Sequence, residues 1–257
     1  MKTKAGAQIN QSIVDGIAVL QALAGSNTPV GGKELSSQLG MDATRVNRLL
    51  KTLASIGMTQ QNKSRQYTPG PGIHVLSAQS LYASGLLRSA IPSLEKLNQY
   101  SLTVALGVLW FDKVSYVYHA KPGMSVAEGI GRIGVRAATT SGIGMVLLAN
   151  ASEESVIDVY QNKIIAGFPD GLDSLLAELA KIREQGYAKF QISQQAGEVG
   201  STAYTLAVAL GNPVNSAIAL QGDIKQQHEP ELIAALCEAR EDIERSLYKI
   251  KSEEGMQ

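Results

Sequence analysis

Residues 33–57, KELSSQLGMDATRVNRLLKTLASIG, decide the fold. Leu35 and Leu39 lie four residues apart, and Gly40 can end a short amphipathic helix in the left-handed conformation. Asp42 can then cap a second helix, along which apolar residues recur at helical spacing. Two short helices joined by a tight turn are typical of a helix-turn-helix. The apolar positions of the second helix are Val46, Leu49, Leu50 and Leu53.

The outward face of this second helix carries side chains that suit DNA recognition. Arginine and asparagine match guanine and adenine edges in the major groove, whereas lysine suits phosphate. We therefore predict that Arg45, Asn47 and Arg48 read bases and that Lys51 contacts phosphate. Thr44, in the first turn, belongs to the same face. The alternative interpretation is a polar helix face that only meets solvent, because short motifs of this kind produce false positives.

The segment after the second helix predicts a wing, and the segment before the first predicts a covering helix. Residues 58–70, MTQQNKSRQYTPG, are polar and turn near residues 61–64, as a hairpin does. Lys63 and Arg65 give the hairpin a basic tip suited to phosphate. Upstream, an apolar helix face is expected to cover both helices. It comprises Ile13, Ile17, Val19, Leu20 and Leu23.

Charge is distributed unevenly although the formal net charge of the 257 residues is zero. Residues 1–70 hold eight basic and three acidic side chains, a balance of +5, which leaves −5 for the remainder. A basic lobe on a neutral chain places the phosphate-attracting field on the predicted helix-turn-helix. The single cysteine, Cys237, excludes a disulfide within the chain and fits a reducing compartment. With no signal-like or membrane-length apolar run, a cytoplasmic protein without membrane contact is expected.

The rest of the chain predicts a helical connector and a mixed domain. No Gly/Ser-rich or Pro-rich run interrupts residues 71–85, so this segment reads as a linker helix. Farther on, β-rich segments alternate with helical patterns, and Asp112-Lys113 marks a hairpin turn. We predict an α+β fold with a winged helix-turn-helix at 1–70 and an antiparallel sheet flanked by helices at 86–257. Strands are expected within 102–120 and at 187–192, 203–210 and 214–220, and helices at 86–100, 142–149, 153–160, 172–183 and 229–249.

Motifs of catalysis and metal binding are weak. Residues 129–134 read GIGRIG, but they neither follow a strand pattern nor open a helix, as a dinucleotide site requires. His74, His119 and His228 are scattered, and Cys237 lies in an apolar helix stripe. We therefore predict no catalytic residue, no metal and no cofactor. An enzyme that turns over a small carboxylate in the second domain remains the rival hypothesis.

These features resemble the IclR family of bacterial transcriptional regulators. SIVDGIAVLQAL at 12–23, ELSSQLGMDATRVNRLLKTL at 34–53 and the wing ending in YTPG at 67–70 resemble its winged helix-turn-helix. The resemblance covers residues 10–75 well and continues more loosely to about residue 250. It implies a DNA-binding regulator, a repressor, with a GAF-like effector-binding domain. Because one winged helix offers few base contacts, we also expect a homodimer or tetramer on an inverted-repeat operator.

The resemblance further implies an effector pocket, in which this chain has exchanged polar residues for apolar ones. The family's Thr-Ala-x-Gly-Lys run resembles residues 141–145, SGIGM, which keep a hydroxyl and lose the lysine. Phe190, Ala203 and Ala219 stand where the family tends to have Asp, Cys and Ser. Fewer hydrogen-bonding groups offset the desolvation of a small oxo-acid poorly. We therefore expect an effector with a carboxylate at the helix N-terminus and an apolar or aromatic body. A vestigial pocket is the alternative.

The polar contacts of this pocket are expected from the backbone amides of Gly142 and Ile143 and from side chains around them. Its walls are expected to be apolar. The predicted effector contacts are Leu106, Val108, Ile130, Ser141, Gly142, Ile143, Phe190, Ser201, Thr202, Ala203, Ala219 and Gln221.

Overall fold

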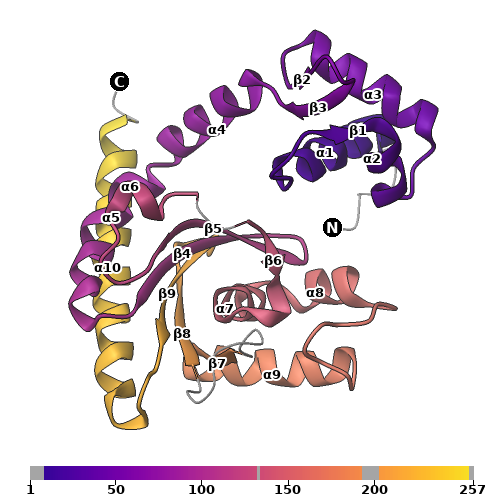
Figure 1. The fold of residues 1–257 in the computed structure, drawn as a ribbon. Coiled ribbons are helices and arrows are strands. Elements are labelled where there is room, and N and C mark those ends of the chain that lie inside the picture. The colour runs from indigo at the N-terminus through magenta and orange to yellow at the C-terminus, as the bar shows by residue number, and fades with distance from the viewer. Residues whose placement is uncertain (1–8, 132–133, 193–202, 255–257) are drawn as a thin grey trace. The chain divides into compact units, whose positions relative to one another are not determined.

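The computed structural model describes residues 9–131, 134–192 and 203–254, which fall into two compact units divided between Ser84 and Gly85. The first unit contains three helices, a small sheet and one further helix (Figure 1). Its elements are α1 (Gln11–Ala24), β1 (Val30–Gly31), α2 (Gly32–Leu39), α3 (Ala43–Ser55), β2 (Thr59–Gln61), β3 (Gln66–Pro69) and α4 (Pro71–Ser84).

Short-range capping defines the helix-turn-helix. Gly40 ends α2 in the left-handed region, with φ of 62°. The Asp42 side chain accepts a hydrogen bond of 3.0 Å from the Arg45 backbone N–H, so one donor at the start of α3 is satisfied. Asn10 caps α1 in the same way, through the backbone N–H groups of Ser12 and Ile13. The predicted helix-turn-helix is therefore present as α2 and α3. The core beneath it contains Val19, Leu23, Val30, Leu35, Val46, Leu50 and Tyr67.

The wing is a three-stranded antiparallel sheet in the order β1-β3-β2. The Asn62 side chain closes its turn by accepting hydrogen bonds from the backbone N–H groups of Ser64 and Gln66 at 3.0 and 2.9 Å. Arg65 adopts φ of 60° in this turn. At the other end, the Thr59 hydroxyl donates to the Leu50 carbonyl at 3.3 Å, which ties the wing to α3.

The predicted apolar face of α1 is only partly buried. Val19 and Leu23 enter the core, but Ile13 and Ile17 are 60% and 47% exposed. The expectation that these two isoleucines cover the helix-turn-helix was wrong. Instead, their side chains line an open groove between α1 and α3, together with Leu49 and Leu53 of α3.

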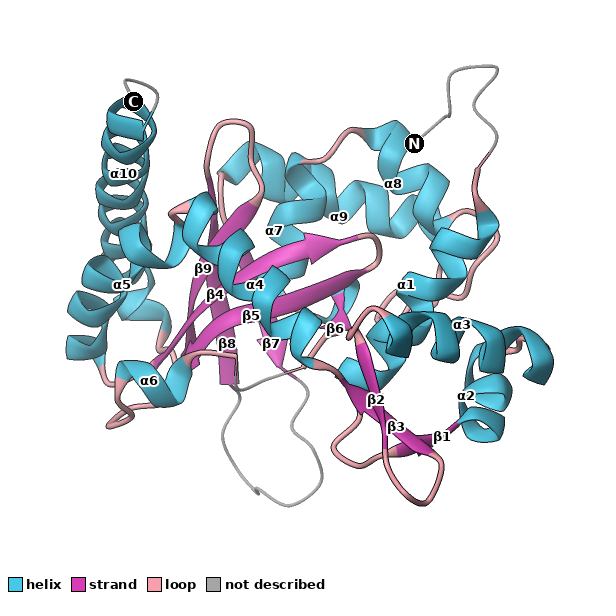
Figure 2. Cartoon of the chain, turned by 90° about the horizontal axis from the view of Figure 1, so that it is seen from above, coloured by secondary structure: helices cyan, strands magenta, loops and turns pink. Residues whose placement is uncertain are grey.

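The second unit is built on a six-stranded antiparallel sheet in the order β6-β5-β4-β9-β8-β7. Figure 2 shows the same elements from above. The strands are β4 (Thr103–Trp110), β5 (Lys113–Ala120), β6 (Arg136–Ala137), β7 (Ala188–Ile192), β8 (Ala203–Leu210) and β9 (Ser216–Gly222). The helices are α5 (Leu86–Leu97), α6 (Val126–Gly129), α7 (Gly142–Asn150), α8 (Glu153–Tyr160), α9 (Leu172–Gln185) and α10 (Glu229–Glu254).

The two faces of this sheet carry side chains of different size. The face toward α5 and α10 is built from large residues such as Leu106, Leu206 and Ile218. The face toward α7 consists largely of alanine and glycine, so α7 can lie close to the strands. The helix also lies close to the 3-10 helix Ala138–Thr140, because a Cβ placed on Gly144 would collide with the Ala138 carbonyl oxygen. The small residues of this face are Ala105, Gly107, Ala207, Ala217 and Ala219.

The predicted hairpin and helical connector are both present in the structure. The hairpin within residues 102–120 is present as β4 and β5, and the connector forms α4, none of whose described residues is buried. The glycine run at 129–134 begins at the end of α6, and Ile130 forms an isolated bridge with Tyr118. Its described part therefore lacks the strand-loop-helix arrangement of a dinucleotide site.

Candidate nucleic-acid interface and effector site

The outward face of α3 presents a line of exposed polar side chains. Thr44, Arg48 and Lys51 follow one another at helical spacing, on the side opposite the buried Val46 and Leu50. This is the geometry with which a recognition helix offers side chains to base edges. At the wing turn, Lys63 and Arg65 are also exposed.

The two other predicted base readers stand at the flanks of this line. Asn47 is exposed, and its side-chain oxygen lies 2.4 Å from where a Cβ on Gly32 would be, so the amide covers the start of α2. Arg45 is half-buried on the α1 side and forms an ion pair with Asp15. The structure thus adds Asp15, which the sequence prediction missed. The signal for it was an acid within the otherwise apolar run SIVDGIAVL.

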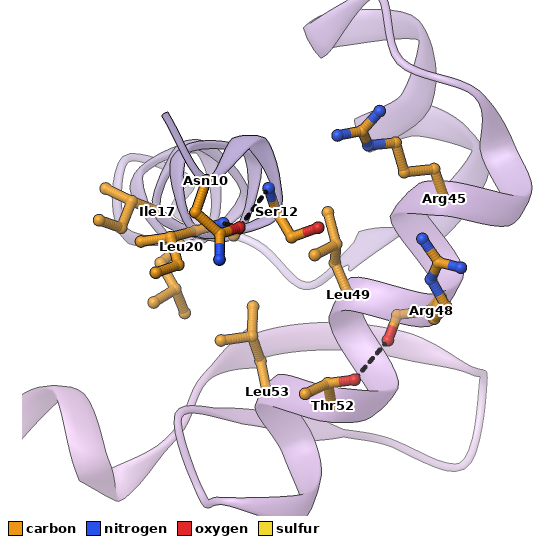
Figure 3. Close-up of a pocket in the computed structure, with 11 residues that line it drawn as sticks. Asn10, Ser12, Ile17, Leu20, Arg45, Arg48, Leu49, Thr52 and Leu53 are labelled. Atoms are coloured by element: carbon orange, nitrogen blue, oxygen red, sulfur yellow. Dashed lines mark hydrogen bonds between the residues drawn. The ribbon is translucent and has the colours of Figure 1, made fainter. Parts of the chain in front are cut away.

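A groove of about 490 Å³ runs between α1 and α3 (Figure 3). Its walls are mostly apolar, with Asn10, Ser12 and Thr52 as polar members and Arg45 and Arg48 at its edge. Inside the groove, the Thr52 hydroxyl donates a hydrogen bond of 3.0 Å to the backbone carbonyl of Arg48. This bond does not involve the Arg48 guanidinium. The apolar lining consists of Ile13, Ile17, Leu20, Leu49 and Leu53.

The N-terminus of α7 meets a row of side chains from four strands. Thr103 pairs with Gln221, Gln221 with Thr205, and Thr205 with Phe190. Cross-strand partners share a face, and here it is the face that α7 covers. A Cβ on Gly142 would lie 2.8 Å from the Thr205 methyl group and 3.5 Å from the Phe190 Cβ. The structure therefore brings the predicted Gly142, Phe190 and Gln221 to one end of the helix.

Ser141 joins this group and is already hydrogen-bonded. Its hydroxyl caps α7 by accepting from the Gly144 backbone N–H at 3.3 Å and lies 2.8 Å from the Tyr116 hydroxyl. The ring of Tyr116 meets that of His119 edge-on, with centroids 5.6 Å apart. A bulge in β5 places both rings on the α7 face. Sequence reasoning missed Thr103, Tyr116, His119 and Thr205, because strand register, which only the structure shows, brings them together.

Part of the predicted pocket wall lies elsewhere. Leu106 packs with α5 and α10 on the opposite face of the sheet, and Val108, two residues along, shares that face. Neither can line a site beside Ser141, so these two predictions were wrong; the β-strand alternation was assigned to the wrong face. Ile130 is 41% exposed. Ile143 and Ala219 are buried in the α7 core, Ala203 begins β8, and Ser201 and Thr202 lie outside the described residues.

A second cavity, of about 260 Å³, opens behind Phe190 between α7, α9 and β7. Its floor is apolar, and the charges at its edge are compensated. The Lys189 ammonium bonds to Glu229, which raises the pKa of Lys189, and Glu178 pairs with Lys181 at 3.1 Å. The cavity therefore suits an uncharged, apolar group. Its apolar lining is Met145, Phe168, Ile182, Ala188 and Phe190.

Within the described residues, no helix combines the length and apolar character needed to cross a membrane. Nor does the described part of the chain group three His, Cys, Asp or Glu side chains so that they could hold a metal ion.

Comparison with known proteins covers both units. The IclR helix-turn-helix domain matches residues 12–63, and the bacterial transcriptional regulator IclR C-terminal domain matches residues 78–245. The HTH-type transcriptional regulator KdgR of Escherichia coli is 30% identical over 193 residues, which cover 72% of this chain and 73% of that protein. The transcriptional repressor IclR of the same organism is 28% identical over 192 residues, or 69% and 68% of the two chains.

Solved structures share the fold. An IclR-type transcriptional regulator from Silicibacter sp. TM1040 superposes with a TM-score of 0.75 at 20% identity, covering 92% of this chain and 96% of that one. An IclR homologue from Microbacterium hydrocarbonoxydans, complexed with 4-hydroxybenzoate, has a TM-score of 0.68 at 19% identity and covers 93% and 99%.

A winged helix-turn-helix joined to a sheet domain of this kind defines a DNA-binding transcriptional regulator. The chain belongs to the IclR family of bacterial transcriptional regulators.

Proposed function

We propose that this protein is a cytoplasmic repressor that binds an inverted-repeat operator as a homo-oligomer and responds to a small carboxylate. The observation that carries the DNA-binding part is the exposed line of Thr44, Arg48 and Lys51 on α3. A single recognition helix makes few base contacts, so a symmetric oligomer on a repeated half-site gives useful specificity. Repression is supported by the IclR relative, which is itself a repressor.

The exposed apolar part of α1 supports association of copies. Ile13, Val14 and Ile17 are each 47% to 60% exposed, and Ile13 and Ile17 line the groove against α3. Contiguous exposed apolar side chains are typical of interaction surfaces. A dimer that pairs through α1 would bury this apolar surface. A tetramer would require a further interface in the second unit.

The second unit supports an effector with two chemically different ends. First-turn amides of α7 have no acceptor within the helix and favour a carboxylate there, close to the Ser141, Tyr116 and Gln221 side chains. The cavity behind Phe190 suits an aromatic body. The complex of the Microbacterium homologue with 4-hydroxybenzoate, an aromatic carboxylate, supports this class. The unit acts in this proposal as a sensor rather than as an enzyme.

Thermal unfolding of the full-length protein with 4-hydroxybenzoate or pyruvate tests the effector class. We expect a higher melting temperature with the aromatic acid than with pyruvate, because only the former fills the apolar cavity. Phe190→Asp, which restores the residue type typical of the family, should reverse this preference. Stabilisation of the wild type by pyruvate alone would contradict the proposed class. Consumption of either compound would favour the enzyme hypothesis, and no response would favour a vestigial pocket.

A further inference from the structure

Asp15 is a buried acid on the DNA-binding unit. Its side chain is only 8% exposed, on the side of α1 that faces α3. A buried carboxylate is stable only when a cation or hydrogen-bond donors compensate it. Here the Arg45 guanidinium supplies the cation, and the Gln11 side-chain amide donates a hydrogen bond of 2.8 Å.

This ion pair fixes the position of Arg45. The residue occupies the third position of α3, where a recognition helix normally presents side chains to bases. Yet its side chain leans toward α1, at the edge of the groove, and is 38% exposed. To form a bidentate contact with guanine, the guanidinium would have to leave Asp15, and the carboxylate would remain buried without its cation.

We propose that Asp15 is a positioning residue that sets DNA selectivity by holding Arg45 out of base reading. This inference rests on the proposed placement of α3 in the major groove. Thr44, Asn47 and Arg48 then read the bases. The carboxylate of Asp15 neutralises the charge of Arg45, so that Arg45 attracts phosphate less strongly. An arginine free to move at this position would contact many sequences alike.

Asp15→Asn in the full-length protein is the direct test. The substitution is nearly isosteric and retains an oxygen that accepts from Gln11. The probes are a duplex selected by the wild type from a random-sequence library and a scrambled duplex of equal composition. We expect several-fold tighter binding of the scrambled duplex and a smaller ratio between the two affinities. The salt dependence should steepen by about 0.9 in log-log slope, as one further phosphate contact predicts.

Two controls separate this role from a change of charge. Glu34→Gln removes one acid from the exposed first turn of α2 in the same unit, so it matches the charge change without touching Arg45. In an Arg45→Gln background, Asp15→Asn should have no effect beyond that of Glu34→Gln. A full effect of Asp15→Asn in that background, or an effect in the wild-type background no larger than that of Glu34→Gln, would overturn the proposal.

The remaining outcomes are equally decisive. Weaker binding of the selected duplex by Asp15→Asn would show that Asp15 orients Arg45 toward a base, contrary to the proposal. If that variant fails to fold, Arg45→Lys still decides: it keeps a cation for Asp15 but cannot form a bidentate guanine contact, so it should leave the preference at every operator position unchanged. Arg48→Gln should relax one position; if it relaxes none, the placement of α3 fails and not the role of Asp15.

Discussion

The DNA-facing surface of α3 and the site at the start of α7 are assembled in different ways. On α3, Thr44, Arg48 and Lys51 come from one helix, so helical periodicity alone places them together. At α7, Thr103, Gln221, Thr205 and Phe190 come from four strands that are neighbours only through their register. The first surface depends on local structure, whereas the second depends on the packing of the entire sheet. Changes to packing should therefore disturb the two sites unequally.

The largest expected effect concerns communication between the two sites. Replacing residues 71–84 with a flexible glycine-serine segment of equal length should leave both units folded and DNA binding intact, because none of the described residues of α4 is buried. It should abolish effector-dependent release, since a flexible chain transmits no change of orientation. Release can be measured by fluorescence anisotropy with 4-hydroxybenzoate. Undiminished release would show that the signal travels by another route, such as a contact between subunits.

A large effect on stability is expected at the α7 packing face. Gly144→Ala forces a Cβ against the Ala138 carbonyl, so we expect the second unit to lose about 1–3 kcal/mol or more. Gly134→Ala is the matched control, because a Cβ there meets no atom within 4 Å among the described residues, and its effect should stay within about 0.5 kcal/mol. Urea unfolding measures both. Equal stabilities of the two variants would refute the close approach of α7 to the 3-10 helix Ala138–Thr140.

A smaller effect is expected from Tyr116→Phe. The substitution removes the hydroxyl that lies 2.8 Å from the Ser141 hydroxyl, and we expect a loss of about 0.5–1.5 kcal/mol. Affinity for DNA in the absence of effector should not change, because α3 does not depend on this bond. If the same variant lost DNA binding while remaining folded, the DNA-facing surface of α3 would depend on packing in the second unit, and the contrast between the two sites would be wrong.

This difference also explains what the sequence could predict. The capping residue Asp42, the stop at Gly40 and the spacing of Val46 and Leu50 are local signals, and they predicted α2 and α3 correctly. The assignment of Leu106 to the pocket failed because alternation along β4 does not say which face meets which helix. Likewise, only tertiary packing reveals that Arg45 is held by Asp15, thirty residues earlier in the sequence.

The central claim is that the outward face of α3 reads the operator, and base-by-base selectivity of single variants tests it most directly. Affinities for every single-base change of a selected duplex should be compared for wild type, Arg48→Ala and Lys51→Ala. We expect Arg48→Ala to lose about 1–3 kcal/mol on the selected duplex and to relax one position in each half-site. Lys51→Ala should weaken all duplexes alike. Unchanged affinity and selectivity of Arg48→Ala would contradict the assignment of α3 as the recognition helix.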